Sequence, residues 1–265
     1  MKTAVITGAA SGIGRELVIK FLDSGFQVAA ADMDATGLQS LTQELATEKL
    51  MTHELNVTDT EAFERFSGEV AGRFGGADVV INNAGITRVG TFLETSPEAF
   101  ANVMDVNFMG VLNGSRAFLP LLKISKGSLV NISSLFGLVG IPKQSAYCAS
   151  KFAVKGFSES LRLEVLKDGV HVATVHPGGV STSIAKNAIF DEQGADKEKA
   201  VKTMEQNALK LSPVTAAEII FKGYESRKNR IIVGKDAKFL DRVQRLFPNL
   251  YPKIISYVLG NSLGK

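Results

Sequence analysis

The sequence predicts an α/β fold in a single domain, a doubly wound parallel sheet of seven strands with helices on both faces. Three observations predict it: apolar runs alternate with amphipathic stretches, most of these runs are apolar at consecutive positions, and no repeat or low-complexity linker divides the 265 residues. Strands that are apolar at successive positions belong to parallel sheets whose two faces are both covered. Right-handed helical crossovers join such strands.

The apolar runs are the expected strands, and the segments between them are the expected helices. The strands are 3–7, 27–31, 50–55, 77–82, 127–132, 170–175 and 230–233. Within 34–47, leucine recurs at spacings of three and four residues, at Leu38, Leu41 and Leu45. Within 59–74, the apolar face comprises Ala62, Phe63, Phe66 and Val70. This periodicity predicts amphipathic helices.

Composition excludes several classes of protein. With 45% apolar and 22% charged residues, the chain has the balance of a globular protein rather than a disordered one. Cys148 is the single cysteine and the three histidines are scattered, so we expect neither an intrachain disulfide nor a metal site. No apolar stretch approaches the length of a membrane span. The first strand begins at Thr3, which leaves no room for a signal peptide, so a cytoplasmic location is expected.

The positive charge is concentrated near the C-terminus. The net charge is +3, but residues 222–265 carry +7 and residues 1–221 carry −4. A nucleic-acid-binding protein normally has its basic patch on the folded reading surface. The mildly acidic body therefore argues against a nucleic-acid partner.

Two segments depart from the alternation of strands and helices. Residues 186–210 are charged and helix-prone and follow the sixth strand. Because ligands bind beyond the carboxyl ends of such strands, we interpret 186–210 as a lid, although a pair of solvated surface helices would explain it as well. The second segment is the tail, 236–265, in which Pro248 and Pro252 are expected to separate two short helices.

The tail combines an apolar stripe with basic side chains. Its apolar residues are Phe239, Leu240, Val243, Leu246, Phe247, Leu250, Tyr251, Ile254, Ile255, Val258 and Leu259, and its basic region includes Lys235, Lys238, Arg242, Arg245 and Lys253. The stripe could pack on the body or on a partner subunit. It could instead contact anionic lipid or cap a substrate pocket, and either of these would favour a lipophilic substrate.

A glycine-rich turn follows the first strand. Gly8, Gly12 and Gly14 have the spacing G-x-x-x-G-x-G and lead into a predicted helix. Glycine permits positive φ and lets the backbone approach a phosphate closely. The N-terminus of the following helix offers free N–H groups and partial positive charge to a pyrophosphate. The motif therefore predicts dinucleotide binding, although such turns can also serve tight packing alone.

Asp32, at the end of the second strand, predicts the type of dinucleotide. A carboxylate there accepts hydrogen bonds from the adenosine ribose hydroxyls and repels a 2′-phosphate. Ser11 is neutral where an NADP-binding protein could place a base, so NAD is favoured over NADP. Arg15 could partly offset the repulsion. The alternative is that Asp32 merely starts the following helix.

Tyr147 and Lys151 lie four residues apart in a helical stretch and therefore share one face of the helix. A phenol with a pKa near 10 is only about 0.1% ionised at pH 7. A neighbouring ammonium favours the phenolate, so we expect Lys151, together with the positive ring of a bound cofactor, to lower the Tyr147 pKa. Surface pairs with this spacing are common, so the pair alone does not establish a site.

Taken together, these motifs resemble the short-chain dehydrogenase/reductase family over residues 3–235. The resemblance rests on Gly8/Gly12/Gly14, Asn82-Asn83-Ala84-Gly85, Asn107, Ser133-Ser134, Tyr147-x-x-x-Lys151 and Pro177-Gly178-Gly179-Val180-Ser181-Thr182, in family order and spacing. It implies a Rossmann-type fold, with 1–235 as the dinucleotide-binding and catalytic domain, including 186–210. Residues 236–265 would be the helical tail of this domain.

The resemblance also implies catalytic roles. Ser134 would bond the substrate oxygen, whereas Ser133 has the wrong spacing to Tyr147. Tyr147 would be the acid/base, and Lys151 would hold the nicotinamide ribose and lower the Tyr147 pKa. Asn107 would support a proton-relay water. Cys148 has no surroundings typical of a nucleophile and is interpreted as a small core residue.

The implied cofactor-binding residues come from every motif. They are Gly8, Ser11, Gly12, Ile13, Gly14, Asp32, Asn56, Val57, Asn83, Ala84, Gly85, Tyr147, Lys151, Pro177, Gly178, Val180 and Thr182. Asn83-Ala84-Gly85 would line the adenine-ribose side, and Thr182 would hold the carboxamide. One position departs from the family: Asn56 stands where an aspartate often accepts a bond from the adenine amine. An amide carbonyl can still accept that bond.

These observations predict an NAD(H)-dependent oxidoreductase that interconverts a secondary alcohol and a carbonyl compound, with a lipophilic substrate. Two alternatives are an NADPH-dependent 3-oxoacyl-type reductase, which Asp32 disfavours, and a non-catalytic dinucleotide-sensing scaffold on the same fold. The intact set of four catalytic residues argues against the scaffold. The family resemblance further implies a homodimer or homotetramer through the helices at about 98–122 and 146–167.

Overall fold

The computed structural model describes residues 1–182, 184, 187–191, 210–253 and 255. Its central sheet contains β1 (Thr3–Thr7), β2 (Gln27–Asp32), β3 (Leu50–Glu54), β4 (Val79–Asn82), β6 (Ser128–Ile132), β7 (His171–Pro177) and β9 (Arg230–Val233). All neighbouring pairs are parallel, in the order β3-β2-β1-β4-β6-β7-β9. The doubly wound seven-stranded sheet is confirmed, with each strand within two residues of its predicted bounds.

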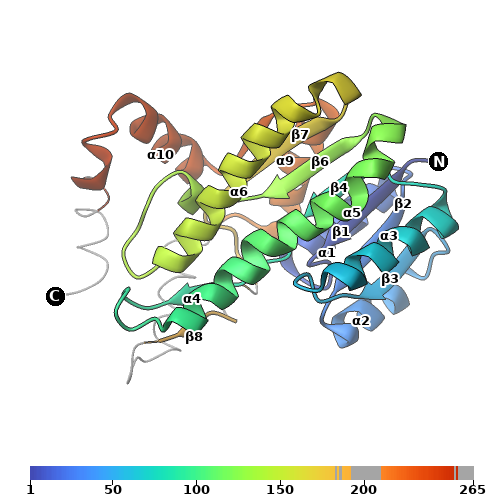
Figure 1. Cartoon of the computed structure of the whole chain (residues 1–265), viewed down its shortest axis with the longest axis horizontal. Helices are drawn as coiled ribbons and strands as arrows, with labels where there is room; N and C mark the ends of the chain where they lie inside the picture. Colours follow the sequence, from blue (N-terminus) through green and yellow to red (C-terminus); the bar gives the residue numbers. More distant parts are fainter. Residues whose placement is uncertain (183, 185–186, 192–209, 254, 256–265) are drawn as a thin grey trace.

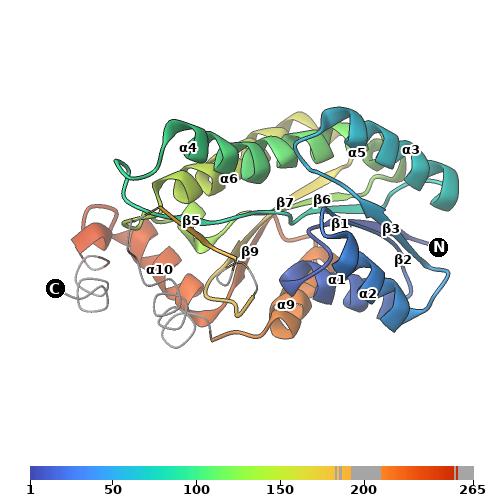
Figure 2. The same cartoon turned by 90° about the horizontal axis from the view of Figure 1, so that it is seen from below.

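Helices cover both faces of the sheet (Figures 1 and 2). One side carries α1 (Gly12–Asp23), α2 (Ala35–Leu45), α9 (Pro213–Glu225) and α10 (Lys235–Leu246). The other side carries α3 (Thr60–Phe74), α4 (Pro97–Met104), α5 (Gly110–Ser125) and α6 (Ser145–Glu164). The helices predicted at 34–47 and 59–74 are thus confirmed as α2 and α3.

The strands supply side chains to two separate hydrophobic clusters. Ala4 and Ile6 of β1 belong to the cluster under α1 and α9, whereas Val5 belongs to the cluster under α3 and α5. Successive side chains of a strand point to opposite faces, so a two-sided core requires apolar residues at every position. In β1 all five residues are buried.

A π-helical turn interrupts the helix expected at 98–122. The turn, η1 (Asp105–Met109), separates α4 from α5. Such turns occur frequently at functional sites, because they rotate a side chain away from its helical position. Asn107 lies within this turn and is completely buried.

A second, two-stranded sheet was not predicted. In it β5 (Arg88–Val89) pairs in parallel with β8 (Ile189–Phe190). The Arg88 guanidinium pairs with Asp191 at 2.7 Å, which ties the two segments further together. The interpretation of 186–210 as a lid falls largely outside the described residues, because only 187–191 and 210 of that segment belong to them.

The tail packs partly on the body. Helix α10 ends at Leu246, just before Pro248, as expected. Ala237 and Ile255 lie in a cluster with the 3₁₀ turn η2 (Leu135–Gly137), and Leu240 packs against it. The predicted stripe is nevertheless not buried as a whole: among its described members, Phe239, Leu246, Phe247 and Leu250 are exposed, and Ile254, Val258 and Leu259 lie outside the described residues. Within the described ranges, no helix has the length and apolar character needed to cross a membrane.

Candidate active site

The predicted motifs converge at the carboxyl edge of the sheet. The glycine turn follows β1, the Asn83 segment follows β4, Ser134 follows β6 and Gly178 follows β7. These four strands are neighbours in the order β1-β4-β6-β7, so their carboxyl ends lie side by side (Figure 1). Ligands bind at this edge in open α/β sheets, next to the point where the strand order reverses.

The glycines of the first turn are required by its geometry. Gly8 and Gly12 have φ of +66° and +56°, in the left-handed region that side chains disfavour. A Cβ on Gly14 would lie 1.9 Å from the carbonyl oxygen of Gly8 and 2.6 Å from the Asn83 amide nitrogen. No side chain fits there unless the backbone moves. The turn therefore holds β1, α1 and the segment after β4 in close contact.

The start of α1 is suited to a diphosphate. In α2, α3, α4 and α9 the side chain of the preceding residue (Asp34, Asp59, Ser96 and Ser212) caps the first turn. At α1 no side-chain cap is formed, and its first turn contains no acidic residue. The backbone N–H groups of this turn and the positive end of the helix dipole are thus directed at the carboxyl edge. The turn fits the phosphates of a dinucleotide.

Asn83 braces this turn. Its amide nitrogen donates to the carbonyl oxygens of Thr7 at 3.0 Å and Gly8 at 3.1 Å. In return, the Thr7 hydroxyl oxygen accepts from the backbone N–H groups of Asn83 and Ala84. The Asn83 amide nitrogen thus bonds the protein backbone of the turn. Gly85, two residues on, lies beside Lys151 and Asn107.

The carboxylate of Asp32 faces the same turn. It accepts from the backbone N–H of Ala10 at 2.9 Å and from that of Asp34 at 3.1 Å. Each bond uses a different oxygen, so both oxygens retain lone pairs for ribose hydroxyls. The nearby Arg15 guanidinium is paired with Glu44 and also approaches Glu16 at 3.8 Å. Two carboxylates therefore compensate the positive charge of Arg15.

The Asn56-Val57 segment has structural partners of its own. The carbonyl oxygen of the Asn56 side chain accepts from both the backbone N–H and the hydroxyl of Thr58, at 3.1 and 2.9 Å. These two bonds fill its lone pairs, so an adenine amine would have to displace one of them. Val57 is buried, and its carbonyl oxygen accepts from Asn113 at 3.0 Å.

Ser134, Tyr147 and Lys151 come together between β6 and α6. Ser134 begins the turn η2 and is hydrogen-bonded to the Tyr147 hydroxyl. Lys151 lies one helical turn after Tyr147, and its ammonium donates to the Ile132 carbonyl at 3.0 Å. Ser133 points elsewhere, because its hydroxyl donates to the Lys151 carbonyl oxygen at 2.8 Å. This placement agrees with the assignment of Ser134 rather than Ser133.

Burial has the largest effect on the pKa values of Tyr147 and Lys151. It raises the pKa of Tyr147 to about 12, although the Ser134 hydrogen bond opposes the rise. Burial also lowers the pKa of Lys151 to about 8. The expected lowering of the Tyr147 pKa by Lys151 and the cofactor ring is therefore absent in the protein by itself. Its ammonium is directed at Ile132 and lies 5.7 Å from the centre of the Tyr147 ring.

Asn107 connects this group to the segment after β4. Its side-chain oxygen accepts from the backbone N–H of Ile86 at 2.8 Å. Its amide nitrogen donates to the Ile86 carbonyl and to the Ser150 hydroxyl, both at 3.0 Å. A Cβ on Gly85 would lie 3.1 Å from the Asn107 oxygen and 3.3 Å from the Lys151 nitrogen. The π-helical turn thus brings Asn107 next to Lys151.

The loop after β7 closes the site beside the glycine turn. Thr182 approaches Gly12 so closely that a Cβ there would lie 3.2 Å from the Thr182 side chain. Gly178 donates to the Val233 carbonyl, and Val180 is buried and pairs with Leu211. These contacts place the Pro177–Thr182 segment at the carboxyl edge, next to the start of α1.

Three residues of this region were missed by sequence reasoning. Asp236 of α10 accepts from the backbone N–H of Gly179 at 2.7 Å, so the tail helix holds the loop after β7. Gln144 bonds Thr87 at 3.1 Å. His176 contacts the Ser134 carbonyl through Nδ1 at 3.1 Å, and burial lowers its pKa to about 4. None belongs to a local motif, so only the position of His176 directly before Pro177-Gly178 could have drawn attention.

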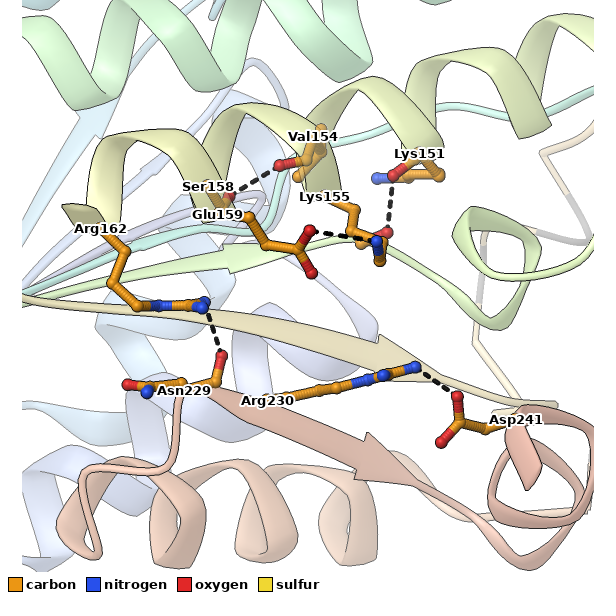
Figure 3. A network of polar contacts seen from close by, with 10 residues as sticks. Lys151, Val154, Lys155, Ser158, Glu159, Arg162, Asn229, Arg230 and Asp241 are labelled. Atoms are coloured by element: carbon orange, nitrogen blue, oxygen red, sulfur yellow. Dashed lines mark hydrogen bonds and ion pairs between the residues drawn. The ribbon is translucent and has the colours of Figure 1, made fainter. Parts of the chain in front are cut away.

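A polar network anchors α10 and β9 to the body (Figure 3). Arg230 of β9 pairs with the buried Asp241 of α10. Arg162 of α6 donates to the carbonyl of Asn229, just before β9, at 2.9 Å. Helix α6, which carries Tyr147 and Lys151, is therefore linked to β9, and β9 is linked to α10.

A cavity of about 410 Å³ adjoins α6. Its lining comprises Gly140, Ile141, Pro142, Ser145, Cys148, Pro252 and Ile255. Consecutive helical residues are rotated by about 100°, so the cavity lies on the Cys148 side of α6, next to the Tyr147 side. Burial raises the pKa of the Cys148 thiol, which makes it a weak nucleophile. The lining is largely apolar and includes two residues of the tail.

Comparisons with known proteins agree with this arrangement. The family model for short chain dehydrogenases matches residues 2–193. The Mycobacterium tuberculosis protein SadH is 38% identical over 261 residues, which cover 96% of this chain and 94% of SadH. The structure of a short-chain dehydrogenase/reductase from Burkholderia phymatum in complex with NAD has a TM-score of 0.84 and 26% identity, covering 94% of each chain. An alcohol dehydrogenase from Thermococcus sibiricus, complexed with 5-hydroxy-NADP, has a TM-score of 0.75 and 28% identity, covering 88% of this chain and 96% of its own.

Proposed function

Because the chain belongs to the short-chain dehydrogenase family, we propose that it is an oxidoreductase that interconverts a secondary alcohol and a carbonyl compound with NAD(H). The observation that carries the proposal is the convergence of Ser134, Tyr147 and Lys151 beside the glycine turn. A protein of the same fold without catalytic activity would tolerate the loss of one of these side chains. In this proposal residues 1–235 form the dinucleotide-binding and catalytic domain, and 236–265 form its tail.

Each side chain has a defined task in the proposed reaction. Ser134 and Tyr147 both bond the substrate oxygen, since their hydroxyls are already hydrogen-bonded to each other. In carbonyl reduction, protonated Tyr147 donates its proton to that oxygen, and in alcohol oxidation its phenolate takes the proton back. The bound nicotinamide supplies the hydride or accepts it, and its oxidised ring carries a positive charge. Lys151 binds the nicotinamide ribose, and Asn107 supports a water that returns the proton to solvent.

The high pKa of Tyr147 has a consequence for this mechanism. With a pKa of about 12, the phenol is protonated at neutral pH and is ready to act as the acid. To act as a base it needs positive charge nearby to stabilise the phenolate. Lys151, with a pKa of about 8, still carries that charge at pH 7. Since Lys151 alone leaves the Tyr147 pKa at about 12, the base form of Tyr147 requires the added positive charge of the oxidised nicotinamide.

Two features support NAD rather than NADP. The Asp32 carboxylate lies at the end of β2 beside the glycine turn, where it would meet a 2′-phosphate. The guanidinium of Arg15 is already paired with Glu44 and cannot freely serve as a phosphate ligand. The bound cofactors of the two similar solved structures are of both types, so the choice rests on these residues.

The surroundings of α6 support a lipophilic substrate and an oligomer. The apolar cavity beside Cys148 can accept a hydrocarbon group of the substrate. Met109, Phe152 and Leu163, along the η1–α5 segment and α6, are exposed apolar side chains. Their burial between two copies of the chain would favour a homodimer or homotetramer.

Fluorescence titration with NADH and, separately, NADPH tests the proposal. The chain contains no tryptophan, so the reduced nicotinamide signal is read with little interference. We expect saturable NADH binding that is at least about ten-fold tighter than NADPH binding, followed by turnover with NAD and apolar secondary alcohols. A preference for NADPH would overturn the assignment of NAD. Failure to bind either dinucleotide would overturn the enzyme proposal.

A further inference from the structure

The outward side of α10 and the turn after it form a surface of exposed basic and apolar side chains, which we call the outer tail surface. Its basic residues are Lys235, Lys238, Arg242, Arg245 and Lys253, all exposed. Its apolar residues are Phe239, Leu246, Phe247 and Leu250, of which Phe239 is 60% and Leu246 is 70% exposed. Exposed apolar side chains gathered on one element of a protein indicate an interaction site.

Basic and apolar side chains are interleaved on this surface. Phe239, Arg242 and Leu246 are three and four residues apart, so they line up on one side of the helix. Arg242 therefore stands between two exposed apolar side chains. The arrangement offers positive charge and hydrocarbon to the same partner.

The acidic residues of α10 offset only part of this charge, because the helix has two acidic residues and four basic ones. Asp241 is buried and paired with Arg230, on the side of the helix that faces the body. Asp236 accepts from the backbone N–H of Gly179. Among the described residues, none of the five basic side chains of the outer tail surface forms an ion pair. Their charge is available to an external partner.

The position of α10 in the molecule allows contact with a flat surface. The helix lies at the end of the molecule opposite the N-terminus in both views (Figures 1 and 2). Residues 1–221 carry a net charge of −4, so an anionic partner would be attracted by the C-terminal region and repelled by the rest. This asymmetry favours an orientation with the C-terminal region, which includes α10, toward such a partner.

We propose that the outer tail surface docks the protein on a lipid bilayer that contains anionic lipids. A bilayer provides negative headgroups for Lys238 and Arg242 and an acyl boundary for Phe239 and Leu246. A nucleic acid would use the charge and leave the apolar side chains in water. Because Pro252 and Ile255, just beyond this surface, line the cavity beside α6, docking brings that cavity close to the bilayer.

Co-sedimentation of the full chain with vesicles tests the proposal. The vesicles contain phosphatidylcholine alone or phosphatidylcholine with one-third phosphatidylglycerol. We expect binding to the anionic vesicles at least about ten-fold tighter than to the neutral ones, and weaker binding in high salt. Absence of binding to the anionic vesicles would overturn the proposal.

Two double variants separate charge from apolar contact. Lys238→Glu/Arg242→Glu removes the charge, and Phe239→Ser/Leu246→Ser removes the apolar side chains. All four side chains are exposed, so both variants should fold. Each is expected to weaken binding to anionic vesicles at least about ten-fold, because the surface uses both features. Unchanged melting temperature and NADH binding establish that the protein is intact.

Matched controls lie away from the tail. Lys49→Glu/Lys167→Glu makes the same change in net charge, and Ile124→Ser/Leu166→Ser removes exposed apolar side chains of α5 and the turn after α6. Both should bind like the wild type. If the charge variant alone loses binding, the apolar side chains do not enter the bilayer and the proposed docking through both features fails. If Phe239→Ser/Leu246→Ser dissociates an oligomer and leaves vesicle binding unchanged, the surface is an interface between copies and the proposal also fails.

Discussion

The ammonium nitrogen of Lys151 lies 5.7 Å from the centre of the Tyr147 ring, yet its hydrogen bond goes to the carbonyl oxygen of Ile132. The two side chains share a face of α6, but both are buried, and burial disfavours the charged form of each. In the free protein, burial therefore disfavours both charged groups that catalysis requires, the Tyr147 phenolate and the Lys151 ammonium. The predictions for Lys151 and Tyr147 follow from this relationship.

Lys151→Met should stabilise the protein while abolishing turnover. The folded-state pKa of about 8 lies below the usual 10.5, so the folded protein binds fewer protons than the unfolded chain between these pH values. Charged Lys151 thus lowers the free energy of unfolding by about 3 kcal/mol below pH 8, a penalty that disappears as pH rises toward 10.5. Without dinucleotide, the variant should melt roughly 4–6 °C higher at pH 7 and close to the wild type above pH 10.

The control for this variant is Lys155→Met, also on α6. Lys155 pairs with Glu159 at 3.1 Å near the surface, and such pairs contribute little to stability. Its melting temperature should stay near that of the wild type. A Lys151→Met variant that melts lower than the wild type at pH 7 would contradict the account of the buried charge.

His176 should make the protein sensitive to acid. Because the Ser134 carbonyl can only accept, Nδ1 must carry the proton in the bond at 3.1 Å. The folded-state pKa of about 4 lies below the usual 6.5, so the unfolded chain binds more protons in between. The free energy of unfolding should therefore fall by about 3 kcal/mol from pH 6.5 to pH 4 through this residue.

Denaturant unfolding at several pH values measures this contribution. His176→Asn keeps a donor near the Ser134 carbonyl but cannot titrate, so its free energy of unfolding should fall less between pH 6.5 and pH 4. His53→Asn is the control, since His53 lies on β3 beside Glu69 and is not packed against Ser134. Equal pH dependence in His176→Asn and the wild type would show that His176 does not become charged on unfolding.

Asp32→Asn should reduce the discrimination between the two dinucleotides. The asparagine oxygen can still accept from Ala10, whereas the bond from the Asp34 N–H and the negative charge are both lost. We expect the ratio of NADPH to NADH dissociation constants to fall about ten-fold, equivalent to roughly 1.4 kcal/mol. Glu44→Gln, which releases Arg15 from its ion pair, should act in the same direction. An unchanged ratio in both variants would remove the basis for assigning NAD.

Gly14→Ala should weaken dinucleotide binding and stability together. The added Cβ would meet the Gly8 carbonyl, so the backbone must shift, at a cost of about 1–3 kcal/mol. Gly68→Ala in α3 is the matched control, because nothing lies within 4 Å of its added Cβ. That variant should be as stable as the wild type or slightly more. Tight NADH binding by Gly14→Ala would show that the close approach at Gly14 is not required.

The sequence predicted the sheet almost completely, because the fold depends on features that a sequence displays directly. Each strand of the central sheet is a local apolar run, and right-handed crossovers between parallel strands put helices on both faces. The spacing of Tyr147 and Lys151 within one helix likewise required no long-range information. The glycine turn was recognisable since positive φ and close approach restrict the residue type.

Other features were not predicted because they depend on contacts between distant segments. The pairing of β5 with β8 joins two strands of two residues each, too short for any periodic pattern. The π-helical turn around Asn107 has no signal of its own in an amphipathic stretch. The rise of the Tyr147 pKa in the protein by itself was not predicted, because the sequence shows the charge of Lys151 but not the burial of the pair. Asp236 was missed because it reaches Gly179 from a helix 57 positions away.

Turnover of Tyr147→Phe with the best secondary alcohol, alongside NADH titration of the same variant, tests the central claim most directly. Proton transfer by a positioned side chain contributes about 10²–10⁴-fold to rate. We therefore predict a loss of turnover of at least about 100-fold with NADH binding unchanged. Tyr224→Phe, at a tyrosine whose pKa burial also raises to about 12, should remain active. Near-normal turnover of Tyr147→Phe would contradict the assignment of Tyr147 as the proton-transfer group.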